Sequence, residues 1–194
     1  MKQSGLNSEI TITSIKDEER EARWCDELAG VVDCVDNDDL PGQLVKALSV
    51  LISFELSTVF INRGRSRPVR LYDTFPDVAK SGLSNYTNTT YVLNPFYRAH
   101  LNGLTQGVYR IGDLAPDEYF SSGLSDVHKV VLMPDEEIGY KTENWPKGFE
   151  ELDIAIPIDD MTIEIGLYSS VEDGGFNDAE IERVRAKTPV IGAI

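Results

Sequence analysis

Side chains that could carry out catalysis or bind a metal are few in this sequence. The two histidines, His100 and His128, belong to no HExxH motif, and neither has a second histidine at the spacing of metal ligands. No CxxC pair, G-x-S-x-G motif or glycine-rich phosphate loop occurs. The neighbouring acids Asp135 and Glu136 could act as a general acid and base, but adjacent acids usually form a solvated loop. We therefore expect no enzyme activity, no metal and no cofactor.

One aromatic segment, YVLNPFYRAHLNGLTQGVYRIGDLAPDEYF, is better suited to binding than to catalysis. Aromatic rings, most of them with polar tips, recur in it and just before it: Tyr86, Tyr91, Phe96 and Tyr97. Ligand pockets have mostly apolar walls with a few placed polar groups, which tyrosine hydroxyls and the Asn94 amide could supply. Alternatively, the rings are core side chains whose hydroxyls reach water or a backbone carbonyl. The residue types leave both interpretations open.

The composition limits the class of protein further. With 194 residues, 41% of them hydrophobic, the chain is long enough for one domain with a buried core. The N-terminus lacks the apolar region of a signal peptide, and no apolar run approaches the ~20 residues of a membrane helix. The net charge of -15 repels a phosphate backbone. These features predict a cytoplasmic protein that binds neither a membrane nor, by itself, nucleic acid.

The first half of the chain predicts two helices and a hairpin. Residues 1–15 read as an arm in which EITITSI is a short strand or is disordered. Apolar residues at three- and four-residue steps predict a helix in DEEREARWCDELAGVVDCVD and another in DDLPGQLVKALSVLISF. Asp38 or Asp39 would cap the second of these helices, with Pro41 in its first turn. STVFINR and RPVRLYDT, joined by GRS, predict the hairpin.

The second half alternates helices and strands. A helix is expected over residues 85–103 around Pro95, then a short strand in GVYRIGDL and a helix over residues 115–128. EELDIAIPI and MTIEIGLYSSV predict a second hairpin, and NDAEIERVRAKTPVIGAI predicts a closing helix. Helices at both ends of an antiparallel sheet indicate an α+β fold, or a sandwich of α/β/α layers.

Three segments contain motifs that occur together in a known family: YVLNPFYRAHLNGLTQGVYRIGDLAPDEYFSS, DEEIGY, and AIPIDDMTIEIGLYSSVEDGGFNDAEIERVRAKTPVI. They resemble the N-terminal sensor region of a proteobacterial group of LuxR-type transcriptional regulators. The resemblance covers residues 86–194 and is most specific in LNPFYRAHLNG and GVYRIGDLAPDEYF. Residues 1–85 match only in the order helix, helix, hairpin.

The resemblance implies a GAF-like α/β/α sandwich with a central antiparallel sheet, preceded by an arm over residues 1–15. In the family a helix-turn-helix domain follows, so this chain should contact DNA only through a separate helix-turn-helix domain. Asn94 stands where the family usually has an aspartate, which in related autoinducer-binding domains accepts a hydrogen bond from the ligand amide. The neutral Asn94 either contacts a ligand or bonds to backbone beside Pro95, and the change argues against acyl-homoserine lactone as the ligand.

We expect an unidentified small molecule to occupy a cavity between the aromatic segment and the sheet. The expected walls are Tyr86, Tyr91, Phe96 and Tyr97 on one side and Phe60, Tyr72 and Ile156 on the other. Asn94 would be the main directional polar group, and Asp135 would lie at the mouth.

Two functions fit these expectations. The chain is a sensor domain that controls a helix-turn-helix domain, or it is a ligand-free dimerisation or protein-interaction module of the same fold. In either case a homodimer could form through apolar residues of the first and closing helices: Trp24, Leu28, Val32, Ile181, Val184 and Ile191. The alternative is that these residues only cover the sheet.

Overall fold

The computed structural model describes residues 3–115, 129–133 and 135–194, with side chains from residue 16 onward. The chain divides into two compact units, Met1–Ile52 and Ser53–Ile194. The helix predicted over residues 115–128 falls on residues 116–128, which lie outside the described part of the chain.

The first unit contains two helices, α1 (Gln3–Asp33) and α2 (Leu40–Leu48). The backbone of residues 9–15, predicted as a strand or as disordered, belongs to α1. Pro41 lies in the first turn of α2, where its missing N–H costs nothing. The predicted apolar stripe of this segment is buried: Leu44, Ala47, Leu48, Leu51 and Ile52.

The second unit is built on an antiparallel five-stranded sheet with the strand order β2-β1-β7-β6-β3. Its strands are β1 (Leu56–Arg63), β2 (Val69–Asp73), β3 (Gly107–Arg110), β6 (Phe149–Ile158) and β7 (Met161–Ser170). Both predicted hairpins, β1–β2 and β6–β7, are confirmed. Two further strands, β4 (Val130–Leu132) and β5 (Tyr140–Thr142), pair only with each other. We call residues 129–133 and 135–145 the β4–β5 arm.

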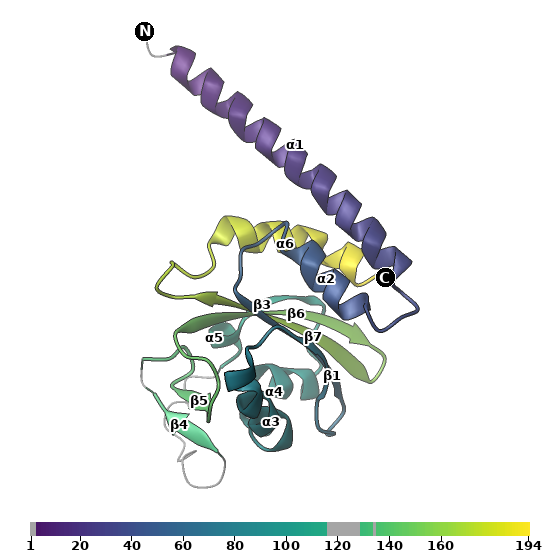
Figure 1. The fold of residues 1–194 in the computed structure, drawn as a ribbon, viewed down its shortest axis with the longest axis vertical. Helices are drawn as coiled ribbons and strands as arrows, with labels where there is room; N and C mark the ends of the chain where they lie inside the picture. The colour runs from purple at the N-terminus through teal and green to yellow at the C-terminus, as the bar shows by residue number, and fades with distance from the viewer. Residues whose placement is uncertain (1–2, 116–128, 134) are drawn as a thin grey trace. The chain divides into compact units, whose positions relative to one another are not determined.

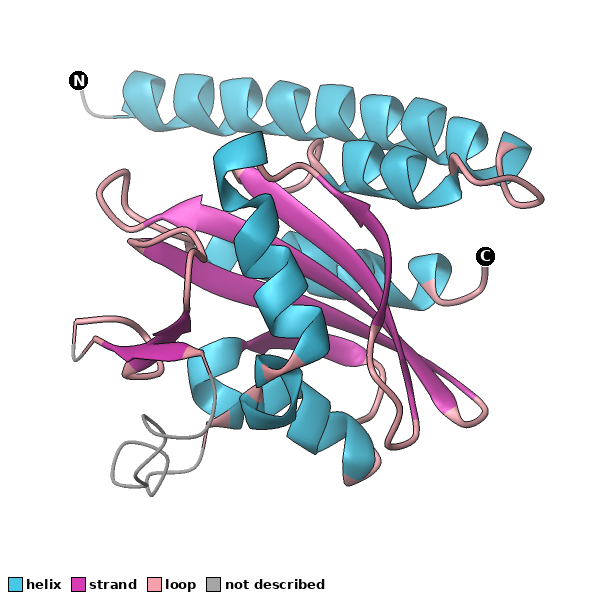
Figure 2. Ribbon diagram, turned by 60° about the horizontal axis from the view of Figure 1, so that its bottom comes forward, coloured by secondary structure: helices cyan, strands magenta, loops and turns pink. Residues whose placement is uncertain are grey.

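Helices cover both faces of the main sheet. Figures 1 and 2 show α6 (Asp178–Ile191) on one face and α3 (Lys80–Asn88) and α4 (Pro95–Leu101) on the other. Three short elements accompany α3 and α4: η1 (Asp77–Ala79), η2 (Thr90–Leu93) and α5 (Ile111–Leu114). The α+β class with a central antiparallel sheet is therefore confirmed. Within the described residues, no helix combines the length and the apolar character that crossing a membrane requires.

The single helix predicted around Pro95 is wrong, because the segment is broken into three pieces. The helix α3 ends at Asn88, the 3-10 turn η2 follows, and Asn94 has an extended backbone with a ψ of 129°. The residue before a proline disfavours helical geometry, so a new helix begins at Pro95. The predicted end is right, since Gly103 follows α4 with a φ of 82°.

Candidate functional site

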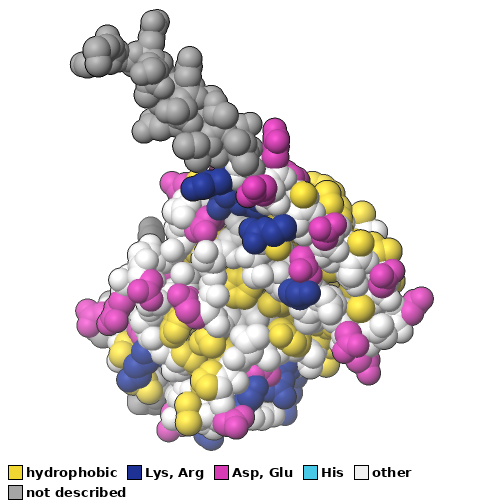
Figure 3. All heavy atoms as spheres, turned by 45° about the horizontal axis from the view of Figure 1, so that its top comes forward, with side chains coloured by type: hydrophobic (Ala, Val, Ile, Leu, Met, Phe, Trp, Pro, Cys, Tyr) yellow, Lys and Arg dark blue, Asp and Glu magenta, His cyan; other side chains and the backbone are white. Residues whose placement is uncertain are grey.

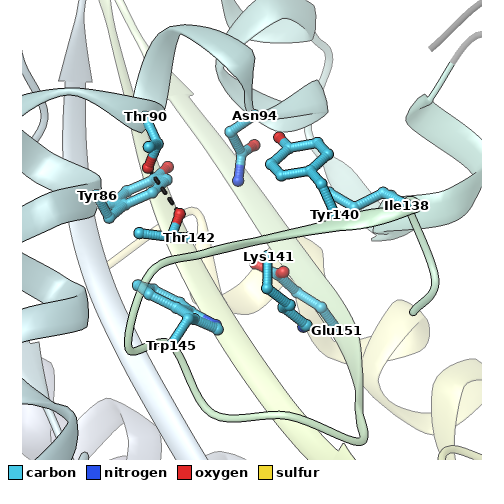
Figure 4. Close-up of a pocket in the computed structure, with 9 residues that line it drawn as sticks. All are labelled: Tyr86, Thr90, Asn94, Ile138, Tyr140, Lys141, Thr142, Trp145 and Glu151. Atoms are coloured by element: carbon cyan, nitrogen blue, oxygen red, sulfur yellow. Dashed lines mark hydrogen bonds between the residues drawn. The ribbon is translucent and has the colours of Figure 1, made fainter. Parts of the chain in front are cut away.

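A small cavity lies between η2 and β5, on the α3–α4 side of the main sheet (Figure 4). Its volume of about 30 Å³ is room for about one or two water molecules rather than a metabolite. It is lined by Tyr86, Thr90, Asn94, Ile138, Tyr140, Lys141, Thr142, Trp145 and Glu151. This mixture of aromatic walls and a few polar groups is typical of ligand sites.

Two of the predicted ligand contacts, Tyr86 and Asn94, line this cavity. Phe60 is adjacent to it, because its ring centroid lies 5.3 Å from that of Tyr86. Both rings belong to a buried aromatic cluster that also contains Trp145 and Tyr168. Tyr86 and Phe60, which were predicted as opposite walls of a cavity, therefore pack directly against each other, with no open space between them.

Four other predicted contacts lie outside the lining. Tyr91 and Tyr97 pack edge to face with ring centroids 4.9 Å apart. Phe96 is fully buried in a separate apolar cluster beside α5. Asp135 is exposed in the turn between β4 and β5. None of these four residues reaches the surface of the cavity.

Tyr72 and Ile156, predicted as the sheet wall, face the other way. Tyr72 pairs directly with Val59, and Val59 and Phe60 are consecutive residues of β1. Consecutive side chains of a strand point to opposite faces, so Tyr72 lies on the face away from Phe60. Ile156 likewise follows Ala155, which packs on the α4 side of the sheet. The wall that the sequence predicted thus mixes residues from both faces.

Asn94 uses its side chain in two directions. Its Oδ1 accepts hydrogen bonds from the backbone N–H groups of Phe96 at 2.7 Å and Tyr97 at 3.2 Å, which caps α4. The structural bond beside Pro95 is therefore present. The amide nitrogen points toward the cavity (Figure 4). An amide N–H group that points into the cavity can donate a hydrogen bond to a ligand.

Glu136, one of the two acids named above, and its neighbour Glu137 make contacts that hold the β4–β5 arm in place. The Glu137 carboxylate accepts from the backbone N–H groups of Gly112 at 3.2 Å and Glu151 at 3.1 Å. Glu136 forms an ion pair with Lys141, with an N–O distance of 3.5 Å. These contacts give both acids a structural task.

Three acidic side chains meet beside the cavity, on the α3–α4 face of the sheet. Glu151 and Asp153 occupy alternate positions of β6, and Glu164 lies on the neighbouring strand β7. Their exposed fractions are 8%, 0% and 1%. Each offers a carboxylate oxygen within 4.8 Å of the others. We call Glu151, Asp153 and Glu164 the acid cluster. Glu151 lines the cavity, and Asp153 and Glu164 lie behind it.

Two members of the acid cluster have side-chain donors. Asn62 of β1 donates from Nδ2 to Oε2 of Glu164 at 2.6 Å. The hydroxyl of Tyr168 donates to Oε1 of Glu151 at 3.0 Å and lies 3.3 Å from the hydroxyl of Thr58. These bonds orient the two glutamates from the flanking strands.

Several buried polar atoms around the cluster lack a partner among the described residues. They are both carboxylate oxygens of Asp153, Oδ1 of Asn62 and the hydroxyl of Tyr86. A buried polar group without a hydrogen bond costs about 1–3 kcal/mol. Most of the buried side-chain atoms that lack a hydrogen bond among the described residues therefore lie around the acid cluster.

Burial raises the pKa of every carboxyl in the acid cluster. The pKa of Glu151 rises to about 7 and that of Glu164 to about 8, chiefly because burial disfavours the ionised form. The pKa of Asp153 is raised well above its usual range, by burial first and then by repulsion from the two glutamates. Burial and the nearby carboxylates also raise the pKa of Tyr86. The cluster therefore retains protons at neutral pH.

Gly166 of β7 makes room for this arrangement. A Cβ atom at that position would lie 2.8 Å from Oγ1 of Thr58 and 2.9 Å from the hydroxyl of Tyr168. Real Cβ contacts are longer, so a side chain would displace the hydroxyls that border the acid cluster. The sequence did contain a sign of the cluster, because GFEELDIAI and TIEIG place acids inside strands whose other face is apolar. The acids were missed because alternate acids in a strand usually face solvent.

Comparison with known proteins supports the fold. The chain matches no family model and no curated protein. Its structure is similar to the crystal structure of the VqsR LBD, or ligand-binding domain, from Pseudomonas aeruginosa, with a TM-score of 0.63 and 16% sequence identity. The match covers 88% of this chain and 92% of that chain. The protein therefore has the same fold as the ligand-binding domain of VqsR.

Proposed function

We propose that the chain is the ligand-sensing domain of a LuxR-type transcriptional regulator, with a GAF-like fold, which binds a small molecule and controls a helix-turn-helix domain. The likeness to the VqsR ligand-binding domain supports a sensing role. The motifs of residues 86–194 support the LuxR type. The observation that carries the proposal is the aromatic cavity, because it places unsatisfied polar groups beside the sheet. In this proposal the protein is cytoplasmic and is not an enzyme.

Ligand entry requires movement of the β4–β5 arm, because the cavity of about 30 Å³ is too small for a metabolite. The arm pairs with no strand of the main sheet, so it can shift without breaking that sheet. The hydroxyls of Thr90 and Thr142, 2.7 Å apart, join η2 to β5 across the cavity (Figure 4). Breaking this contact would widen the cavity, and displacement of the arm would report the bound ligand to a neighbouring domain.

The second candidate is a ligand-free interaction module, and the small volume of the cavity favours it. The homodimer belongs to both proposals. The residues expected on the closing helix, Ile181, Val184 and Ile191, are buried within the single chain, as is Trp24. Val32 is 57% exposed and remains available for such a contact.

The proposal is tested by screening metabolites of different charge for stabilisation of the protein and then filling the cavity. A ligand that binds the folded state raises the melting temperature. Ile138→Trp places a large ring at the lining and should abolish this stabilisation. The control Val131→Trp, at a position of the same arm that is 43% exposed and away from the lining, should retain it.

Two results would contradict the sensor function. One is a library without any stabilising compound, together with a dimer in light scattering, which favours the interaction module. The other is a stabilising compound that binds Ile138→Trp as well as it binds the wild type, which moves the site away from this cavity.

A further inference from the structure

The acid cluster has many more acceptors than donors. Each carboxyl offers two oxygens, yet described side chains donate only to one oxygen of Glu151 and one of Glu164. Neither oxygen of Asp153 has a donor within the described part of the chain. Lys141, which lines the cavity next to Glu151, pairs its ammonium with Glu136 instead. The cluster is thus built of oxygens and is short of positive charge.

Two further buried oxygens, from other elements, are also unsatisfied. The hydroxyl of Tyr86 comes from α3, and Oδ1 of Asn62 comes from β1. These residues are only 5% and 0% exposed. Tyr86 lines the cavity and is close enough to all three acids for their charges to raise its pKa. Unpartnered oxygens from the helix α3 and from a third strand, β1, therefore accompany the carboxylates of β6 and β7.

We propose that the acid cluster binds the ammonium group of a small, slender organic amine whose carbon chain occupies the cavity once the β4–β5 arm has shifted to widen it. An ammonium group has three N–H donors and no acceptor, which complements a site made of oxygens. With tetrahedral geometry and N–O distances of ~2.8 Å, its acceptors lie about 4.6 Å apart. The carboxylate oxygens here lie within 4.8 Å of one another. The proposal rests on the proposed function, since it takes the same cavity as the ligand site.

The rest of the cavity suits the carbon chain of such an amine. Tyr86, Tyr140 and Trp145 give it aromatic walls. Aromatic faces attract cations and also bury methylene groups, so they serve both ends of an alkylammonium ion. The Asn94 amide nitrogen, which also points into the cavity, would donate to a polar oxygen at the far end of the ligand. An anionic ligand would instead meet three acids.

Protons compete with the amine for this site. The groups that face the cluster are Glu151 and Asp153 from β6, Glu164 and Tyr168 from β7, Thr58 and Asn62 from β1, Tyr86 from α3, Tyr140 and Lys141 from β5, and Glu137 from the arm. An ammonium ion favours the ionised carboxylates, so its binding releases protons. Affinity should therefore increase from pH 6 to pH 8, as the carboxyls lose their protons.

The experiment compares three molecules with the same four-carbon chain: n-butylamine, n-butanol and butyrate, with 1,4-diaminobutane as a second amine. Binding is measured by calorimetry and by melting temperature at constant ionic strength. The amines should bind with a stoichiometry of about one and should release protons. Asp153→Asn should weaken amine binding at least about tenfold, because it removes a charge-assisted acceptor. Asp173→Asn makes the same chemical change at an exposed position outside the cavity lining and should leave the affinity unchanged.

Several results would overturn the proposal. In the first, n-butanol or butyrate stabilises the protein and neither amine does. In the second, magnesium or calcium chloride stabilises it and the amines have no effect. In the third, Asp153→Asn binds the amines as well as the wild type does. Failure of the amine proposal can be distinguished from failure of the proposed sensor function. If a neutral or acidic compound stabilises the wild type but not Ile138→Trp, the cavity is a sensor site and only the amine assignment is wrong.

Discussion

Asn94 illustrates how one side chain can serve the fold and face a ligand at once. Its oxygen caps α4 through two backbone N–H groups, and its nitrogen points into the cavity. Asn94→Ala should lower the free energy of unfolding by about 1 kcal/mol, the usual cost of losing an N-cap. Asn94→Asp keeps the capping oxygen and should restore this stability. Urea denaturation measures both, and an unchanged midpoint for Asn94→Ala would refute the capping role.

The acid cluster predicts an unusual pH dependence of stability. A carboxyl whose pKa is raised in the folded state keeps its proton there while the unfolded chain has lost it, so stability falls as pH rises between the two values. For Glu164, whose pKa rises from 4.5 to about 8, this window runs from roughly pH 4.5 to pH 8. Glu164→Gln should therefore be more stable than the wild type at pH 8, by on the order of 4 kcal/mol.

Denaturation of both proteins from pH 5 to pH 8, without added amine, checks this expectation. The wild type should lose stability across the range. The Gln variant should lose less, because it lacks the Glu164 carboxyl, but it should still lose some, because Glu151 and Asp153 still titrate. Parallel curves for the two proteins would show that Glu164 is not held protonated.

At the scale of elements, Gly82 allows the helix α3 to pack closely against the loop that follows β5, because it has no side chain. A Cβ atom on Gly82 would lie 2.5 Å from the carbonyl oxygen of Asn144 and 2.9 Å from the backbone nitrogen of Trp145. Gly82→Ala should therefore destabilise the protein by about 1–3 kcal/mol, although alanine is the better helix former. At Gly30 of α1 the nearest atom is 3.8 Å away, so Gly30→Ala should be neutral or stabilising. Thermal unfolding of the two variants makes the comparison, and equal melting temperatures would contradict the close approach.

Elements with strong periodicity were predictable from the sequence, and short ones were not. The hairpin β6–β7 was predictable because each strand has ten residues and because a turn of two acids lies between the two strands. The strands β4 and β5 have three residues each, too few for alternation to show. Missing β5 also meant missing one wall of the cavity, because Tyr140, Lys141 and Thr142 of β5 all belong to its lining. A wall from an unpredicted strand could not be assigned to the site.

At the scale of the whole molecule, charge determines which partners the chain can meet. The net charge is -15, and on the face seen in Figure 3 acidic and basic side chains are interspersed. In the basic β1–β2 hairpin, Arg70 pairs with Asp73 at 3.0 Å, Arg67 bonds to Asn88, and Arg63 lies 4.0 Å from Asp160. We expect the isolated chain not to bind duplex DNA at physiological salt. Fluorescence anisotropy with labelled duplex tests this, and tight binding that weakens with salt would contradict it.

The position of all three acids on one hairpin has a consequence for the kinetics of folding. Only the two-residue turn at Asp159 and Asp160 separates β6 from β7, so the acids come together as soon as this hairpin closes. Contacts between segments close in sequence form early, before strands brought from a distance can pair. Repulsion among ionised carboxylates would therefore act on the transition state as well as on the folded state. Alkaline solution should slow refolding itself, and a protonated hairpin should nucleate the sheet fastest.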